Sequence, residues 1–310
     1  MRRSLVLAVV FMFMFMAWPV TPAAAGTTVV VTIKPVHALV AGVMRGIAEP
    51  RLLVRGTSSP HTYALRPSDA AALYEAAILF RVSPQLEPFT PKIVRALPKE
   101  VQVVSLMDAP GLELLAVRRG PAFERNSGHV AQAGGLDVVD GHAWLDPENA
   151  KAMVAYVAET LVQMDPAHAE ALRSNAQELR QRLELLKGEL EQALKPVADR
   201  PYVVFHDAMH YFERRFNLNA VGSISVSPEV PPSAQRVIEV RNKLRAVGAQ
   251  CAFAEPQFSM ALVSAVVEGT GARVGMLDPE AINLAPGPDL YFTLMRRLAA
   301  DLTRCLTMPA

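Results

Sequence analysis

The sequence DPAHAEALRSNAQELRQRLELLKGELEQALKP, residues 165–196, predicts one long helix near the middle of the chain. Asp165 suits the N-cap and Pro166 the first helical position, and no further proline follows until Pro196. Leucines recur along one face of this helix: Leu172, Leu179, Leu183, Leu186, Leu190 and Leu194. Such a stripe fits a coiled-coil dimer or a strut within one chain, and the short heptad run favours the strut. At 1.5 Å per residue the helix would be about 45 Å long, enough to run along two domains.

Short apolar runs alternate with helical stretches on both sides of this helix. Before it we expect strands at 29–33, 52–54, 77–82 and 101–104, with helices starting near prolines 35, 67 and 91. After it we expect strands at 202–205, 220–224, 251–254 and 273–277. The alternation predicts an α/β fold of two lobes, each a mostly parallel sheet flanked by helices. The expected organisation is a signal peptide (1–25), an N-terminal lobe (26–164), a connecting backbone helix (165–197) and a C-terminal lobe (198–310).

The N-terminus has the features of a cleavable export signal. Two arginines precede an apolar stretch from Leu5 to Val20, and the segment ends in three alanines before Gly26. This pattern fits a signal peptide cleaved after Ala25 better than a membrane-spanning helix, which needs about 20 apolar residues. No later apolar run is long enough to cross a bilayer. We therefore expect the mature chain, from Gly26, to lie free in an exported aqueous compartment.

Charge and cysteine content narrow the function classes. The chain has 31 Lys and Arg against 30 Asp and Glu, and removing the signal takes away two arginines and no acid. The mature chain is thus close to neutral, which argues against a nucleic-acid partner. Its two cysteines are Cys251 and Cys305. In an oxidising compartment such a pair favours one disulfide, while two thiolate metal ligands are the alternative.

Three of the seven histidines occupy positions that indicate a shared site. His61 follows a strand and a turn, His206 directly follows the strand at 202–205, and His142 precedes a helix start. Groups beyond the carboxyl ends of strands meet in one crevice of such a sheet. Asp278 adds a carboxylate directly after the strand at 273–277. Three imidazoles and one carboxylate form a four-coordinate set that suits Zn²⁺, one ion per chain, between the two lobes.

Other polar residues are candidates for supporting roles. Asp207 is expected to orient His206 or another imidazole by accepting its second N–H. Glu255 follows a strand and could reach the cleft, although an ion pair with a nearby arginine is the favoured explanation. His129 lies in the glycine-rich surface loop expected at 118–140, where it could pass metal to the cleft as an accessory ligand, although a role without metal is the favoured explanation. His168, in the first turn of the long helix, is expected to be solvated.

Four segments in order give a specific resemblance. They are SPHTYALRPSD at 59–69, HAWLDP at 142–147, FHDA at 205–208 and FAEPQF at 253–258. Together they resemble the ZnuA/TroA-type metal-binding proteins of ABC transporters, over nearly the whole mature chain. The resemblance implies two α/β lobes joined by one backbone helix, with a single metal in the cleft and delivery to a membrane permease. The family's ligand positions map onto His61, His142, His206 and Asp278.

The resemblance also bears on the metal and on the cysteines. The histidine at position 206 resembles the residue of the zinc members, since the manganese-binding branch usually has a carboxylate there. Imidazole also suits Zn²⁺ better than Mn²⁺. Cys251 and Cys305 resemble the disulfide pair of the Gram-negative zinc members. Two departures occur: many zinc members carry a His-rich loop where this chain has only His129, and Pro60 replaces an acid found before the first histidine in some relatives. The second departure gives Asp278 more weight.

We therefore expect a monomeric periplasmic receptor, not an enzyme, that captures Zn²⁺ with high affinity and delivers it to an ABC-transporter permease. A receptor of the same type for Mn²⁺ or Fe²⁺ is the alternative. A secreted zinc hydrolase would need an open coordination position and a general base, and the sequence has no His-Glu-x-x-His motif. A surface adhesin is a third interpretation, and no repeat or cell-wall anchor supports it.

Overall fold

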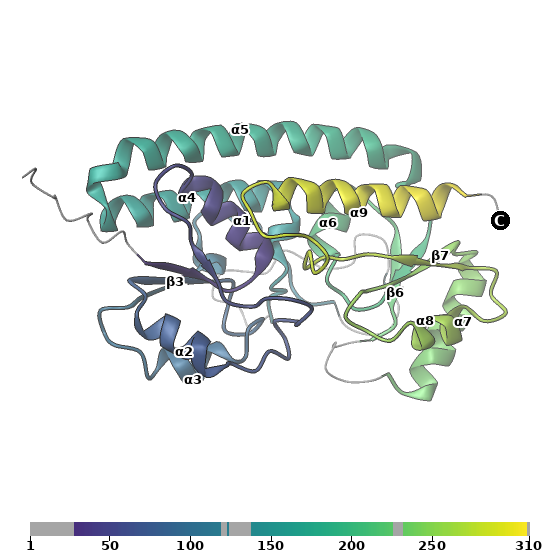
Figure 1. The fold of residues 1–310 in the computed structure, drawn as a ribbon. Coiled ribbons are helices and arrows are strands. Elements are labelled where there is room, and N and C mark those ends of the chain that lie inside the picture. The colour runs from purple at the N-terminus through teal and green to yellow at the C-terminus, as the bar shows by residue number, and fades with distance from the viewer. Residues whose placement is uncertain (1–27, 119–122, 124–137, 226–231, 309–310) are drawn as a thin grey trace, which may run out of the picture.

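The computed structural model describes residues 28–118, 123, 138–225 and 232–308. Within them the chain forms two parallel four-stranded sheets beneath a layer of long helices (Figure 1). The first sheet has the order β2-β1-β3-β4 and contains β1 (Val29–Val31), β2 (Arg51–Leu52), β3 (Ile78–Arg81) and β4 (Gln102–Ser105). The second has the order β6-β5-β7-β8 and contains β5 (Tyr202–Val204), β6 (Ala220–Ser223), β7 (Cys251–Ala254) and β8 (Arg273–Met276).

The predicted fold class is confirmed, and each expected strand lies within two residues of its expected bounds. The strands form where β-branched and aromatic residues are buried on both faces, as in β1, whose three valines are at most 2% exposed. In each sheet the chain runs from the first strand outward to the second, then returns to the other side of the first. This reversal places a topological switch point between β1 and β3, and another between β5 and β7.

Helices connect the strands and cover the sheets. They are α1 (Lys34–Val43), α2 (Pro67–Tyr74), α3 (Thr90–Val94), α4 (Pro147–Met164), α5 (Ala169–Leu194), α6 (His210–Arg215), α7 (Ala234–Val247), α8 (Met260–Val267) and α9 (Leu290–Thr307). Four 3₁₀ turns accompany them: η1 (Leu106–Asp108), η2 (Ala143–Leu145), η3 (Pro166–His168) and η4 (Lys195–Val197). The first three helices begin within one residue of the prolines that predicted them, because proline suits the first turn of a helix.

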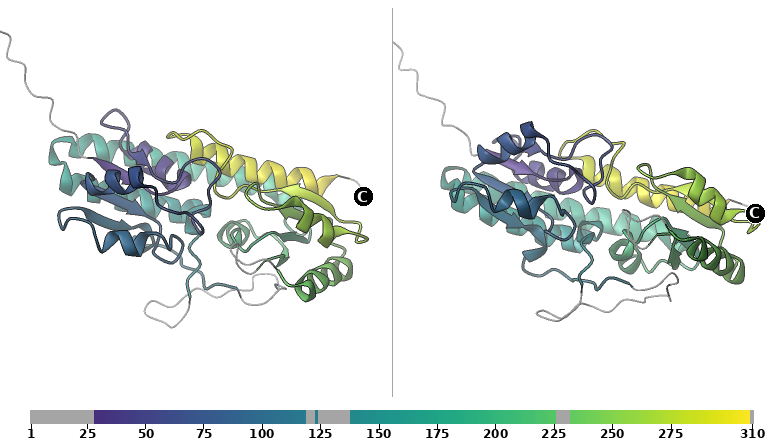
Figure 2. Two further views of the ribbon diagram at one scale, coloured as in Figure 1. Left: turned by 60° about the horizontal axis from the view of Figure 1, so that its bottom comes forward. Right: turned by 90° about the horizontal axis from the view of Figure 1, so that it is seen from below.

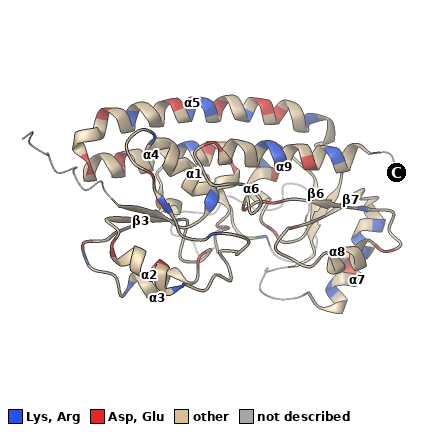
Figure 3. Cartoon of the chain, in the orientation of Figure 1, with Lys and Arg blue, Asp and Glu red and all other residues tan. Residues whose placement is uncertain are grey.

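The long central helix is α5, which extends above both sheets (Figure 1). It packs against α1, α4 and α9, and all six leucines of its predicted stripe are buried within this one chain. The intrachain strut is therefore confirmed. Gly42 of α1 allows the close approach, since a Cβ added there would lie 2.8 Å from a methyl carbon of Leu179. Acidic and basic residues alternate along α5 in Figure 3.

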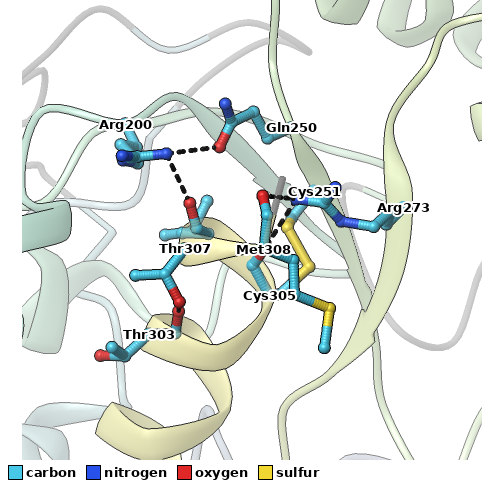
Figure 4. The surroundings of a disulfide bond; sticks show 9 residues. Arg200, Gln250, Cys251, Arg273, Thr303, Cys305, Thr307 and Met308 are labelled. Atoms are coloured by element: carbon cyan, nitrogen blue, oxygen red, sulfur yellow. Dashed lines mark hydrogen bonds between the residues drawn. A yellow bond between two sulfur atoms is a disulfide. The ribbon is translucent and has the colours of Figure 1, made fainter. Parts of the chain in front are cut away.

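The last helix, α9, joins parts of the fold that are far apart in the sequence. It packs against α5, α1 and β8, and the Cys251–Cys305 disulfide joins it to β7 (Figure 4). The predicted disulfide is thus confirmed. Near its C-terminal end, the Nη2 group of Arg273 donates to the carbonyl oxygen of Cys305 at 2.9 Å, and Arg200 donates to that of Leu306 at 2.8 Å.

The two halves share one apolar core. A single cluster of buried residues beneath α5 includes Val31, Leu39, Leu186, Phe253 and Leu302, and so draws on both sheets and on three helices. The two sheets lie side by side in front of this layer when the molecule is seen from below (Figure 2). A shared core resists wide separation of the halves. The lobe boundaries given above stay a prediction.

Candidate metal centre

Three histidines come from different loops of the fold and meet between its halves. His61 lies in the turn at 60–62 after β2, where the N–H of Thr62 bonds the carbonyl oxygen of Ser59 at 3.3 Å. His142 immediately precedes η2, and His206 follows β5 by two residues. His142 and His206 are buried, and His61 is half-buried. The position of His206 at the β5/β7 switch point is where side chains converge in such sheets.

The three imidazoles form a compact triangle. Their ring centroids lie 5.4 Å apart for His61 and His142, 5.7 Å for His61 and His206, and 5.4 Å for His142 and His206. One ring nitrogen of each lies within 4.8 Å of the others. Zinc–nitrogen bonds of about 2.0–2.1 Å in a tetrahedral site place the nitrogens about 3.3 Å apart. Small movements of the side chains would therefore close the triangle around one ion.

Carboxylates hold two of these rings by the nitrogen that faces away from the triangle. Nδ1 of His142 lies 2.7 Å from Oδ1 of Asp140, and Nδ1 of His206 lies 2.5 Å from Oε1 of Glu255. A neutral imidazole that donates from Nδ1 keeps its lone pair on Nε2. Nε2 of both histidines is buried without a hydrogen-bond partner among the described residues. These two nitrogens are therefore available to a metal.

Electrostatics favour the unprotonated form of His61 and His142, which is the form that a metal requires. Burial and repulsion from the neighbouring rings lower the pKa of His61 to about 2, and burial and repulsion from His206 lower the pKa of His142 to about 3. Burial also disfavours the charged form of His206, but attraction to Glu255 outweighs it and the pKa of His206 is raised. At neutral pH His61 and His142 are ready to bind a cation without losing a proton.

Asp278 follows β8 as predicted, but its carboxylate bonds the backbone. Oδ1 accepts the N–H of Ile282 at 2.9 Å, and Oδ2 accepts that of Asn283 at 3.1 Å. Among the described residues, the group that could hold a metal contains the three histidines and neither Asp278 nor any other carboxylate. Its role as the fourth ligand stays a prediction.

Glu280 is a second acid in this segment and is not among the ligands predicted from the sequence. Its side chain is buried, Oε1 accepts from the hydroxyl of Ser59 at 3.3 Å, and Oε2 has no hydrogen-bond partner in the described part of the chain. Burial raises the pKa of Glu280 to about 8, although attraction to His206 acts the other way. A buried acceptor without a partner is costly, and a bound cation would satisfy it. The only feature of the sequence that could have indicated this residue is its position, two residues beyond Asp278.

The supporting residues differ in part from those expected. Glu255 binds His206 rather than forming the arginine ion pair that we favoured. Asp207 accepts from the guanidinium of Arg118, so Glu255 provides the contact to His206 that we expected from Asp207. Asp140, at the end of the glycine-rich stretch, was not singled out. His129 and the signal segment lie outside the described residues.

Known proteins resemble this chain over nearly its whole length. The profile of the ZnuA family, described as zinc-uptake complex component A, periplasmic, matches residues 29–305. The high-affinity zinc uptake system protein ZnuA of Brucella suis biovar 1 (strain 1330) is 42% identical over 305 residues, which cover 90% of this chain and 91% of the relative.

Solved structures share the fold. A crystal structure of ZnuA has a TM-score of 0.75 at 26% identity, covering 90% of this chain and 100% of the other. A ZnuA deletion mutant with zinc bound has a TM-score of 0.75 at 25% identity, covering 91% and 100%. A mutant of the laminin-binding adhesin Lmb from Streptococcus agalactiae has a TM-score of 0.75 at 27% identity, covering 91% and 100%.

Proposed function

The chain belongs to the ZnuA family of periplasmic zinc-uptake components, and on that premise we propose that it captures Zn²⁺ and delivers it to the permease of an ABC transporter. One observation supports this most directly: three imidazole nitrogens from separate loops lie within 4.8 Å of one another. Three nitrogen ligands favour Zn²⁺ over Mn²⁺, which prefers oxygen. The family consists of solute-binding receptors, so the metal is cargo and not a catalyst.

We assign three of the ligands to His61, His142 and His206. For the fourth, the contacts favour Glu280, since both oxygens of Asp278 already accept backbone N–H groups while Oε2 of Glu280 is buried without a partner among the described residues. Two isosteric variants separate the two acids. If Glu280 is the ligand, Glu280→Gln should weaken zinc affinity at least tenfold and Asp278→Asn should weaken it less. The opposite order would restore the prediction made from the sequence.

Metal content tests capture. Residues 26–310, purified without a His tag from a periplasmic extract, should contain about one zinc per chain by elemental mass spectrometry, as expected for one four-coordinate site. His206→Ala should lose the metal, whereas the exposed control His168→Ala should keep it. Manganese or iron at the same stoichiometry would change the cargo and keep the receptor. Absence of metal even after reloading with zinc would contradict the proposal.

Zinc uptake by cells tests whether the protein delivers zinc to a transporter, and it distinguishes this role from adhesion. A strain without this protein should grow poorly when a chelator limits zinc, and the wild-type gene should restore growth while the His206→Ala gene should not. Normal zinc accumulation in the deletion strain would instead favour a surface role like that named for the laminin-binding neighbour.

The same proposal covers compartment and assembly. The mature protein would be a periplasmic monomer, released by cleavage after Ala25, with one zinc per chain. Across the residues that the structure describes, no helix has the length and apolar character needed to cross a membrane. N-terminal sequencing and native mass spectrometry of the periplasmic protein would check the cleavage site, the mass and the stoichiometry together.

A further inference from the structure

Lys34 is a buried lysine that connects the two halves of the molecule. It begins α1 directly beyond β1, and its residue is only 8% exposed. Its ammonium group donates to three carbonyl oxygens of one loop: Ala281 at 3.2 Å, Ile282 at 2.6 Å and Leu284 at 3.1 Å. A lysine ammonium has three N–H donors and no acceptor. All three donors therefore have a backbone partner in the loop between β8 and α9.

That loop needs such support because it is buried and irregular. Residues 279–282 are buried, and they belong to neither a helix nor a strand. Buried carbonyl groups outside regular structure must find donors elsewhere. Ala281 has a φ of 58°, in the left-handed region that residues with a Cβ adopt rarely, and it has no exposed surface. Surrounding contacts must hold such a conformation in place.

The contacts that hold the loop surround Glu280. Lys34 binds the carbonyl of the next residue, Ala281, and the indole N–H of Trp144 donates to the carbonyl of the preceding residue, Pro279, at 3.2 Å. Asp278 closes the turn from the loop's own side by accepting the N–H groups of residues 282 and 283. The backbone on both sides of Glu280 is thus fixed, while Oε2 of its carboxyl group has no partner among the described residues.

We propose that Lys34 is a positioning residue for the zinc site, which holds the 281–284 backbone from the N-terminal half so that Glu280 faces the three histidines. The proposal rests on the function and on the Glu280 ligand assignment given above. It explains why a charged side chain is buried beneath the cleft: its partners are carbonyl dipoles of the segment that carries the ligand. It also gives Asp278 a structural role, that of shaping the turn.

A double-mutant cycle on zinc affinity tests this role. Lys34→Met keeps the length of the side chain and removes its donors. Zinc affinity is measured by competition with a chromophoric chelator for the wild type, Lys34→Met, Glu280→Gln and the double variant. Loss of a residue that orients a ligand costs about 10–100-fold in metal affinity. We expect a loss of at least tenfold in each single variant and no further loss in the double variant, because Lys34 acts through Glu280.

Controls separate positioning from stability and from the function itself. Lys151→Met removes a lysine that pairs with Glu148 and Glu184 on α4 and α5, and it should leave the affinity unchanged. The visible absorption of bound Co²⁺ should change in the same way in Lys34→Met and Glu280→Gln, which a general loss of stability would not produce. If Lys34→Met does not fold, Lys34→Gln, which retains N–H donors on a shorter side chain, replaces it in the cycle at low temperature.

Each outcome has one meaning. A wild-type chain that binds no zinc removes the proposed function, and Glu280→Gln with wild-type affinity removes the ligand assignment and this inference with it. Zinc binding by the wild type, with losses from Lys34→Met and Glu280→Gln that multiply in the double variant, overturns the role of Lys34 alone.

Discussion

Glu255 and Asp140 each bond a histidine on the nitrogen that faces away from the other two rings. Each carboxylate also accepts the backbone N–H of the same histidine, at 3.2 Å for His206 and 3.0 Å for His142. Two contacts per residue fix both the rotation of the ring and the tautomer that carries the lone pair. The geometry of the site thus depends on side chains that need not touch the metal.

Removing Glu255 should weaken the site without removing a ligand. In Glu255→Ala, His206 loses its orienting acceptor, and zinc affinity should fall about 10–100-fold. Chelator competition measures the change. Glu178→Ala is the matched control, since Glu178 pairs with Arg45 on the exposed surface and should leave the affinity unaltered. Equal affinities for Glu255→Ala and the wild type would show that the hydrogen bond does not hold the ring.

The sequence allowed the three histidines to be predicted, but not the carboxylates behind them. His61 and His206 follow strands, and parallel strands bring their carboxyl ends to one edge. The pairing of Glu255 with His206 depends on the register and twist of β5 and β7, which no local pattern specifies. Asp278 and Glu280 are two residues apart in one turn, so the path of the turn decides which of them faces the cleft.

A buried acid away from the site gives a pH prediction. Burial raises the pKa of Glu87 to about 7, above the value near 4.5 that it has when exposed. The folded state therefore holds this proton more tightly than the unfolded state, so the group's contribution to stability is present below about pH 4.5 and is lost as the pH rises through 7. Glu87→Gln carries no titrating group there. Its free energy of unfolding relative to the wild type should rise by roughly 3 kcal/mol between pH 4 and pH 8.

Urea unfolding of zinc-free protein at both pH values measures this difference. All other groups titrate alike in the two proteins, so the change between them isolates Glu87. A difference that is independent of pH would mean that Glu87 titrates in the folded state as it does in the unfolded state.

At the level of elements, α5 provides a comparison between two leucines two residues apart. Leu183 is fully buried against the helix layer, whereas Leu185 is 69% exposed. Leu183→Ala should lower the free energy of unfolding by about 2–5 kcal/mol, because it removes buried methyl groups and leaves a cavity. Leu185→Ala should change it by less than about 0.5 kcal/mol. Urea denaturation of both variants measures the two changes. Similar losses of unfolding free energy would mean that α5 is not packed as described.

Local sequence patterns predicted whether a segment is a helix or a strand. They predicted the residues at which each helix or strand ends less accurately. The strands were predictable because short β-branched and apolar runs sit between turn residues, as in 29–31 and 78–81. The central helix was expected from 165 to 197, but the α-helical part is Ala169–Leu194, with 3₁₀ turns on either side. The tighter turns contain Pro166 and Pro196, whose rings remove N–H donors near the helix ends.

For the whole molecule, zinc should act as a link between the halves. His61 and His142 belong to the first half of the chain and His206 to the second, so the site is complete only in the folded protein. Zinc at a thousand times its dissociation constant should add about 4 kcal/mol of stability, which raises the melting temperature by several degrees. Differential scanning calorimetry should show this rise for the wild type and His168→Ala but not for His206→Ala. A rise of equal size in all three would place the stabilising ion elsewhere.

The packing between distant elements was the least predictable feature. The amphipathic pattern of α9 shows which face is buried, yet it does not show that α1 is one of its neighbours. Contacts of this kind depend on the complete topology, since many apolar faces could cover one another equally well. The shared core beneath α5 follows from those contacts.

The contact between α1 and α9 has a consequence for folding during synthesis of the chain. Of the helices that the structure describes, α1 is the first to be synthesised and α9 the last, so α1 lacks this neighbour until residues 290–307 have emerged. During that interval α4 and α5 can already cover other parts of α1, but the apolar surface that packs against α9 stays open to aggregation. A chain that stops before residue 290 would never supply that cover. Arrival of α9 therefore completes the packing of α1 and of β8, one element from each half, in a single step.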